Sequence, residues 1–388
     1  MTESPKDFEK HEPQLEEQLE SKSFPDDSMN PAHTKPEFLL GVKMTMVVSA
    51  ATMMAFLTLL DQSIIGTVAS KDAFLMFFLA YIHGVLFANT DISVGSDIMA
   101  ALVSYFDDSD SWDSQRKSEL KNAVEDFAEN FITHFILPIK ASSGKTPQPT
   151  SESIEPSSSP DTPQSISILR QQCLERDRCR CVVSRKFDRK EAERRLDQQG
   201  EECKDDDGEP LKNESHSRFA YLKISHILPY RITNVAPGDL DISKSKKNVL
   251  RMLDWFDPGV SDLIEGANIH SPSNALTLAH RYHRLFGDFQ ICFEPTGIPN
   301  QYTIETTQRF ACMRDSLFPV TRTLTFSPTI DAPSPRLLAI HHAIAQIIHL
   351  SGVATYLDEI LQDLEVQGVK EDGSTHLGHL TTLRFGGW

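Results

Sequence analysis

Two apolar runs near the start of the chain constrain most strongly what it can fold into. Residues 44–60 read MTMVVSAATMMAFLTLL and residues 73–88 read AFLMFFLAYIHGVLFA, without a charged side chain in either. A helix needs about 20 apolar residues to cross a bilayer, so each run lies at the short limit of a membrane span. Two hydrophobic helices within residues 36–90 are expected, as a membrane anchor or as buried helices of a soluble domain. The polar, acidic residues 1–35 are expected to be disordered.

The sequence around the first run carries a resemblance. Residues 56–70, FLTLLDQSIIGTVAS, resemble the first transmembrane helix of fungal major facilitator drug transporters, in which an Asp-Gln-Ser/Thr-Ile pattern ends the span. The resemblance ends near Ser70, and a single span cannot form an alternating-access pathway. A transporter-like leader joined to an unrelated protein, as in a chimeric gene model, is the simplest interpretation. A membrane-associated protein of transporter descent remains one hypothesis.

Charge and cysteine content restrict the remaining function classes. The net charge of −17 argues against a protein that coats nucleic acid through general electrostatic attraction. Residues 166–295 nevertheless hold 21 Lys and Arg against 21 Asp and Glu, so a nuclease core there is not excluded. The six cysteines are too sparse and irregular for a disulfide scaffold and indicate a reducing, intracellular compartment. Nuclear, cytoplasmic and membrane-associated locations stay open.

The chain divides at a Ser/Thr/Pro-rich stretch. Residues 91–140 form a helical region in which apolar spacing predicts one amphipathic helix running up to Pro138. Residues 141–165 read as a linker, residues 166–365 as the main domain and residues 366–388 as a tail without a usable pattern.

Within the main domain the pattern predicts several elements. Residues 185–210 are too charged to form core and are interpreted as a surface insertion within a hairpin. The other expected elements are a short strand at 180–185, a strand at 218–228 closed by Pro229, a helix over 246–257 ended by Pro258 and Gly259, a turn and short helix followed by a strand at 289–293, and a helical pair over 334–365 broken near Ser351 and Gly352.

Three short motifs in this domain occur in a suggestive order. Residues 180–184 read RCVVS, residues 226–229 read HILP and residues 274–286 read NALTLAHRYHRLF, in which Asn274 stands nine residues before His283. This ordered set resembles the HNH endonuclease family, and a fungal branch of it in particular, over about residues 91–365. The resemblance implies an α+β fold with a ββα-metal core embedded in a mostly helical domain.

The same resemblance implies a metal-dependent endonuclease that hydrolyses phosphodiester bonds of DNA. A neutral imidazole can take a proton from water at physiological pH if a hydrogen bond to its other nitrogen fixes its orientation, and His226 would be that base. Asn274 would hold the loop of the ββα unit. His283, supplemented by His280, would bind a divalent metal, Mg²⁺ or Mn²⁺ first and Zn²⁺ as an alternative.

The sequence departs from the family at several positions. Ser225 stands where many members place a carboxylate metal ligand before the base histidine, so a carboxylate such as Asp288 or Asp254 would have to come from elsewhere. Ala279 and Tyr282 occupy places where zinc-stapled members have cysteines, so that structural zinc is not expected. A degraded HNH scaffold that only binds a partner is therefore the alternative function.

Simpler interpretations stay open for individual residues. Asn274 could be only a helix N-cap, and His280 only a surface residue. His341 and His342 have no spaced partner and are interpreted as structural. The basic run that starts at Ser184, together with Arg194 and Arg195, could follow a phosphate backbone or form a solvated insertion.

Overall fold

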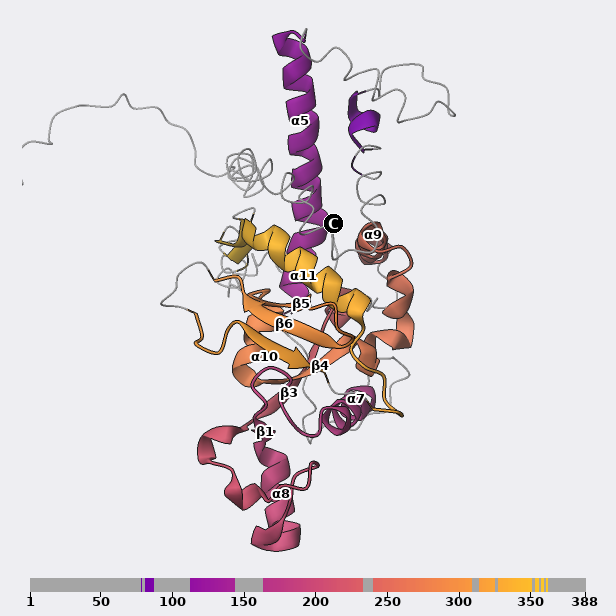
Figure 1. Cartoon of the computed structure of the whole chain (residues 1–388). Helices are drawn as coiled ribbons and strands as arrows, with labels where there is room; N and C mark the ends of the chain where they lie inside the picture. The colour runs from indigo at the N-terminus through magenta and orange to yellow at the C-terminus, as the bar shows by residue number, and fades with distance from the viewer. Residues whose placement is uncertain are drawn as a thin grey trace, which may run out of the picture. The chain divides into compact units, whose positions relative to one another are not determined.

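The computed structural model describes residues 78, 81–86, 112–143, 163–232, 240–308, 314–324, 327–350, 353–355, 357–358 and 361 (Figure 1). The expectations for residues 1–70, for most of the linker and for the tail lie outside these residues. In the second apolar run, residues 81–86 are helical, and Phe78 and Ile82 are buried. None of the helices in the described ranges combines the length and the apolar character needed to cross a membrane.

The amphipathic helix extends further than expected. It comprises α5 (Ser114–Phe131), a π-helical segment (Ile132–Ile136) and α6 (Leu137–Ser143), so the prediction that it ends at Pro138 is wrong. Proline normally interrupts a helix because it lacks an N–H and its ring crowds the preceding turn. The wider π turn directly before Pro138 accommodates that ring.

Two strands and a helix form the centre of the main domain. Strand β3 (Leu222–His226) pairs antiparallel with β4 (Ala275–Ala279), with His226 opposite Ala275, and α10 (His280–Gly287) follows β4 directly. The strand predicted before Pro229 is confirmed. Residues 275–279, however, were expected to belong to a turn and a short helix, and they form β4 instead. All five residues of β4 are buried, so the strand lacks the alternation that marks a half-exposed strand.

Helix α7 (Pro163–Arg176) packs against this hairpin and buries a small apolar cluster with it (Leu169, Cys173, Ile224 and Ala275). Helix α9 (Leu240–Phe256) confirms the helix predicted before Pro258. Its Phe256 ring lies 5.4 Å from the Phe135 ring of the π segment, measured between centroids. The long N-terminal helix is thereby tied to the main domain.

A second sheet adjoins the hairpin and was predicted only in part. It contains β5 (Ile291–Pro295), β6 (Gln301–Thr306) and β7 (Val320–Thr323) in antiparallel order, and α11 (Pro335–Leu350) lies across β5 (Figure 1). The strand expected at 289–293 corresponds to β5, whereas β6 and β7 were not predicted. His341 of α11 is stacked between the rings of Phe286 and Phe289, at 3.8 and 4.6 Å, and is a core residue.

Residues 178–220, called the charged lobe below, fold around a small core of their own. Strand β1 (Phe187–Asp188) pairs in parallel with β2 (Phe219–Ala220), and α8 (Arg189–Gln199) follows β1. The expectation that residues 185–210 are too charged to form core is wrong, because three residues of that range, Phe187, Ala192 and Cys203, are buried together with Cys179 and Leu211. The strand expected at 180–185 is a turn apart from a single bridge between Arg180 and Phe187.

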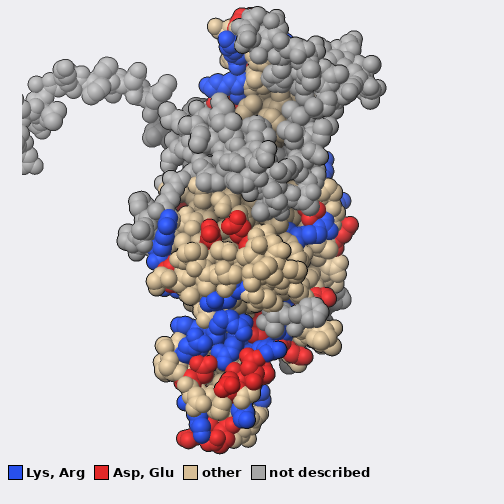
Figure 2. Space-filling view, viewed as in Figure 1, with Lys and Arg blue, Asp and Glu red and all other residues tan. Residues whose placement is uncertain are grey.

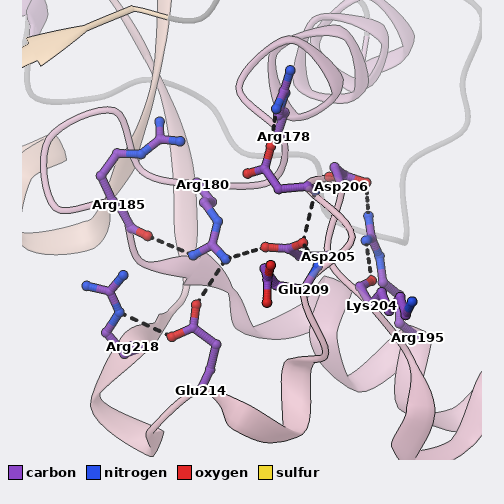
Figure 3. A network of polar contacts seen from close by, with 11 residues as sticks. Arg178, Arg180, Arg185, Arg195, Lys204, Asp205, Asp206, Glu209, Glu214 and Arg218 are labelled. Atoms are coloured by element: carbon purple, nitrogen blue, oxygen red, sulfur yellow. Dashed lines mark hydrogen bonds and ion pairs between the residues drawn. The ribbon is translucent and has the colours of Figure 1, made fainter.

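Ion pairs make this lobe compatible with its high charge. Figure 3 shows the Arg180 guanidinium between two carboxylates, and it donates to Asp205 at 2.6 Å and to Glu214 at 3.0 Å. The guanidinium groups of Arg180 and Arg195 each lie 5.3 Å from the centroid of the Phe187 ring. Because the charges neutralise one another around an aromatic ring, a sequence too charged for an ordinary core still folds.

Candidate functional site

His226 lies at the end of β3 and is almost completely buried. Its Nε2 is 3.2 Å from Nδ1 of His270, and its own Nδ1 is buried without a hydrogen-bond partner among the described residues. The sequence argument required a group that fixes the orientation of this imidazole, and His270 occupies that position. The sequence analysis did not identify His270, although its position just before the turn that leads into Asn274 could have indicated it.

Burial makes His226 a neutral imidazole. Its pKa is lowered to about 3, first because desolvation disfavours the charged form and then because His270 and His283 lie nearby. This pKa is well below the ordinary histidine value of 6.5. At neutral pH the ring has a free lone pair, which a proton acceptor needs.

Asn274 connects the loop that follows β3 with the loop that precedes β4. Its fully buried side chain accepts a hydrogen bond from the N–H of Leu228 at 2.9 Å and donates to the carbonyls of Leu228 at 3.1 Å and Ile269 at 3.0 Å. The backbone N–H of Ile227 also donates to the carbonyl of Asn274. The interpretation of Asn274 as an N-cap is wrong, because its side chain bonds across the loops rather than to a following helix.

A buried arginine supports the loop that carries Asn274. The Arg176 guanidinium donates to the carbonyl of Pro272 at 2.7 Å and to that of Ala275 at 2.9 Å, on either side of Asn274. Asp177 balances its charge through two hydrogen bonds of 2.9 Å each. The end of α7 is thereby fastened to the beginning of β4.

His283, on α10, completes a group of three buried histidines, called the histidine cluster below (His226, His270 and His283). Its Nε2 is buried without a partner within the described ranges. Burial, Lys223 and His280 lower its pKa to about 4, while a hydrogen bond with the backbone of Ile224 opposes this shift. The structure thus brings His226 and His283 together from β3 and α10.

His280 does not join the histidine cluster. Its side chain is exposed and lines a surface cavity together with Tyr221 and Arg281. Arg194 and Arg195, which were considered for phosphate binding, both form ion pairs with Glu191 within α8. Both arginines are thus engaged within the charged lobe.

The described residues do not show the metal site expected from the sequence. Ser225 is buried, and the carboxylates considered as substitutes lie elsewhere: Asp254 accepts hydrogen bonds from Ser261, and the charged neighbours of Asp288 are Lys140, Asp358 and Arg284. Across the described residues, no group of three or more His, Cys, Asp or Glu side chains is arranged to hold a metal ion. The unpartnered Nε2 of His283 fits one ligand position.

Comparison with known proteins gives one family match, and it spans this site. Residues 181–294 match the family model described as HNH endonuclease, and the match includes all three members of the histidine cluster as well as Asn274. No curated protein and no solved structure matches the chain. The resemblance of residues 56–70 to a transporter, and the fungal branch, receive no support from these comparisons. Residues 181–294 therefore form an HNH endonuclease family domain.

Proposed function

We propose that the domain hydrolyses phosphodiester bonds of DNA, with His226 as the general base. The observation that carries the proposal is the pairing of His226 with His270, at 3.2 Å between Nε2 and Nδ1. This contact orients the ring and leaves the second nitrogen of His226 without a partner among the described groups. A base needs this combination of fixed orientation and free lone pair. The match of residues 181–294 to the HNH family supports the reaction class.

In the proposed reaction, Nδ1 of His226 takes a proton from the attacking water. A base with a pKa of about 3 is weak, but the bound phosphate brings negative charge next to the imidazole. Opposite charge favours the protonated form and so raises the pKa toward the range useful for catalysis. Asn274 keeps the loop after β3 in place, so the imidazole stays aimed while its charge changes.

His283 is the residue proposed to hold a divalent metal ion through Nε2. When bound, such an ion neutralises charge on the phosphate oxygens and on the leaving oxygen. Mg²⁺ and Mn²⁺ are the proposed ions, and Zn²⁺ is an alternative because imidazole is a better ligand for it. With Ser225 in place of a carboxylate, the remaining ligand positions fall to the substrate phosphate and water.

Plasmid cleavage by the full-length protein tests the proposal. Supercoiled DNA should be nicked or linearised with Mg²⁺, Mn²⁺ or Zn²⁺ and should stay intact with a chelator. His226→Ala should abolish cleavage, and His283→Ala should lower the apparent affinity for the metal, while both keep the circular dichroism spectrum of the folded protein. The exposed His216→Ala is the matched control. Cleavage by His226→Ala at the rate of this control would refute the assignment.

A non-catalytic HNH-fold binding module is the second candidate, and the absence of a carboxylate at Ser225 favours it. Titration calorimetry of the full-length protein with Mn²⁺ and Zn²⁺ separates the two functions. A catalytic domain should bind at least one of these ions with a stoichiometry of one, and His283→Ala should weaken that binding. Binding of DNA without any binding of metal, and without cleavage, would favour the binding module.

A further inference from the structure

The surface cavity beside α10 is separate from the histidine cluster and has its own chemistry. Its volume is about 430 Å³. Four segments distant in sequence meet there: the residue before β1, the link between β2 and β3, the first turn of α10, and Asp315. The side chains that determine its character are Lys186, Tyr221, His280, Arg281, Tyr282 and Asp315. Figure 2 shows Lys and Arg side chains gathered on the viewed face where, in Figure 1, the charged lobe meets the sheets.

The cationic side chains of this cavity, Lys186 and Arg281, are more available for binding a ligand than the arginines inside the charged lobe. Lys186 is half-buried, and its ammonium group forms no ion pair with any described residue. Arg281 is 65% exposed and approaches Asp315 only at 3.5 Å, a distance at which an exposed pair contributes little. Asp315 is also engaged by the hydroxyl of Tyr282, which donates to it at 3.1 Å. The cavity therefore has excess positive charge facing solvent.

Tyr221 adds an exposed aromatic surface at the edge of the same cavity. It is 53% exposed, which is high for a large ring in a folded domain. The Arg189 guanidinium lies 6.0 Å from the ring centroid, and the Tyr221 carbonyl accepts a hydrogen bond from the N–H of His280. The ring is thus presented by fixed backbone next to cations. Cations beside an exposed aromatic ring are the combination that proteins use to hold a nucleic-acid strand.

The cavity and the histidine cluster share two structural elements. Tyr221 directly precedes β3, at whose far end His226 lies, and His280 is three residues before His283 on α10. Five residues of extended strand span roughly 16 Å, which is about the length of five base pairs of duplex DNA. The length of β3 between His226 and Tyr221 is therefore within the reach of one bound nucleic acid.

We infer that this cavity is a second contact site for the nucleic-acid substrate, in which Lys186 and Arg281 bind backbone phosphates and Tyr221 packs against a sugar or base. The inference rests on the proposed nuclease function, because it assigns this site to the same substrate. It explains why Tyr221 stays exposed and why Lys186 forms no ion pair with a described residue on a surface where the neighbouring charges are paired. It also places substrate contacts on both sides of the first turn of α10.

Binding measurements can be made without cleavage in the full-length His226→Ala protein. Fluorescence anisotropy with a labelled 20-base-pair duplex, repeated over a range of salt concentrations, reports affinity and its salt dependence. Lys186→Ala with Arg281→Ala should reduce the slope of log K against log salt concentration by about 1.8, because each phosphate contact contributes about 0.9. Tyr221→Ala should weaken binding about tenfold with an unchanged slope. Lys190→Ala with Arg194→Ala removes the same charge from the exposed face of α8 and is the matched control.

Each outcome has a definite meaning. If the His226→Ala protein binds DNA and the cavity variants behave like the α8 control, the cavity is not a substrate site, although the proposed nuclease function stands. If the His226→Ala protein binds no DNA at any salt concentration, both fail together. Tyr221→Ala keeps the test decisive even if the double variant is unstable, since an exposed side chain contributes little to folding.

Discussion

Asn274→Ala is the substitution whose effect follows most directly from the structure. The fully buried amide makes three hydrogen bonds with backbone groups of Leu228 and Ile269. Alanine leaves one N–H and two carbonyls buried without partners, at about 1 to 3 kcal/mol each. Because the surrounding groups can shift and recover part of this cost, the expected loss in the free energy of unfolding is about 3 to 5 kcal/mol. Asn274→Asp should not rescue it, because a carboxylate would face the two carbonyls to which the amide donates.

Urea denaturation measures this loss, and a change of 3 kcal/mol should move the midpoint by roughly 1 M or more. Asn268→Ala is the matched control, since Asn268 lies in the same loop but is exposed. Its side chain donates one hydrogen bond, to the carbonyl of Asp262. That variant should change stability by about 0.5 kcal/mol or less. If Asn274→Ala and Asn268→Ala denature at the same urea concentration, Asn274 does not hold the two loops together.

Two further predictions concern stability away from the histidine cluster. Arg180→Ala should destabilise the charged lobe by about 3 kcal/mol, because Asp205 and Glu214 lose their shared cation, whereas the exposed Arg194→Ala should leave the urea midpoint unchanged; equal midpoints would contradict this. Burial lowers the pKa of His341 to about 3, against 6.5 in the unfolded chain, so the unfolded state binds one more proton below pH 6.5 and stability falls as the pH drops. His341→Phe should reduce that fall in stability by about 1.4 kcal/mol per pH unit between pH 6 and 4. Denaturation at each pH measures the change. An unchanged pH dependence would show that His341 does not titrate in this way.

The three short motifs of the main domain could be found in the sequence because their chemistry depends on residue type and order. The strand that Pro229 follows was predicted from the sequence and is confirmed, whereas the roles assigned there to His226, Asn274 and His283 stay predictions. Strand β4 was not, because burial on both faces removes the alternation by which a strand is recognised. The core of the charged lobe was also missed, since ion pairs between distant residues such as Arg180 and Asp205 leave no local pattern.

By itself the sequence determined which side chains are available for chemistry and in what order they occur, because local turns and strand ends depend on neighbouring residues. Only the tertiary structure decided which of them meet. It brought His270 to His226 across 44 residues, left His280 at the surface and placed Asp254 and Asp288 beside other partners. It also lowered the pKa of His226 to about 3, because desolvation depends on every element packed around the imidazole and not on the residues beside it in the chain.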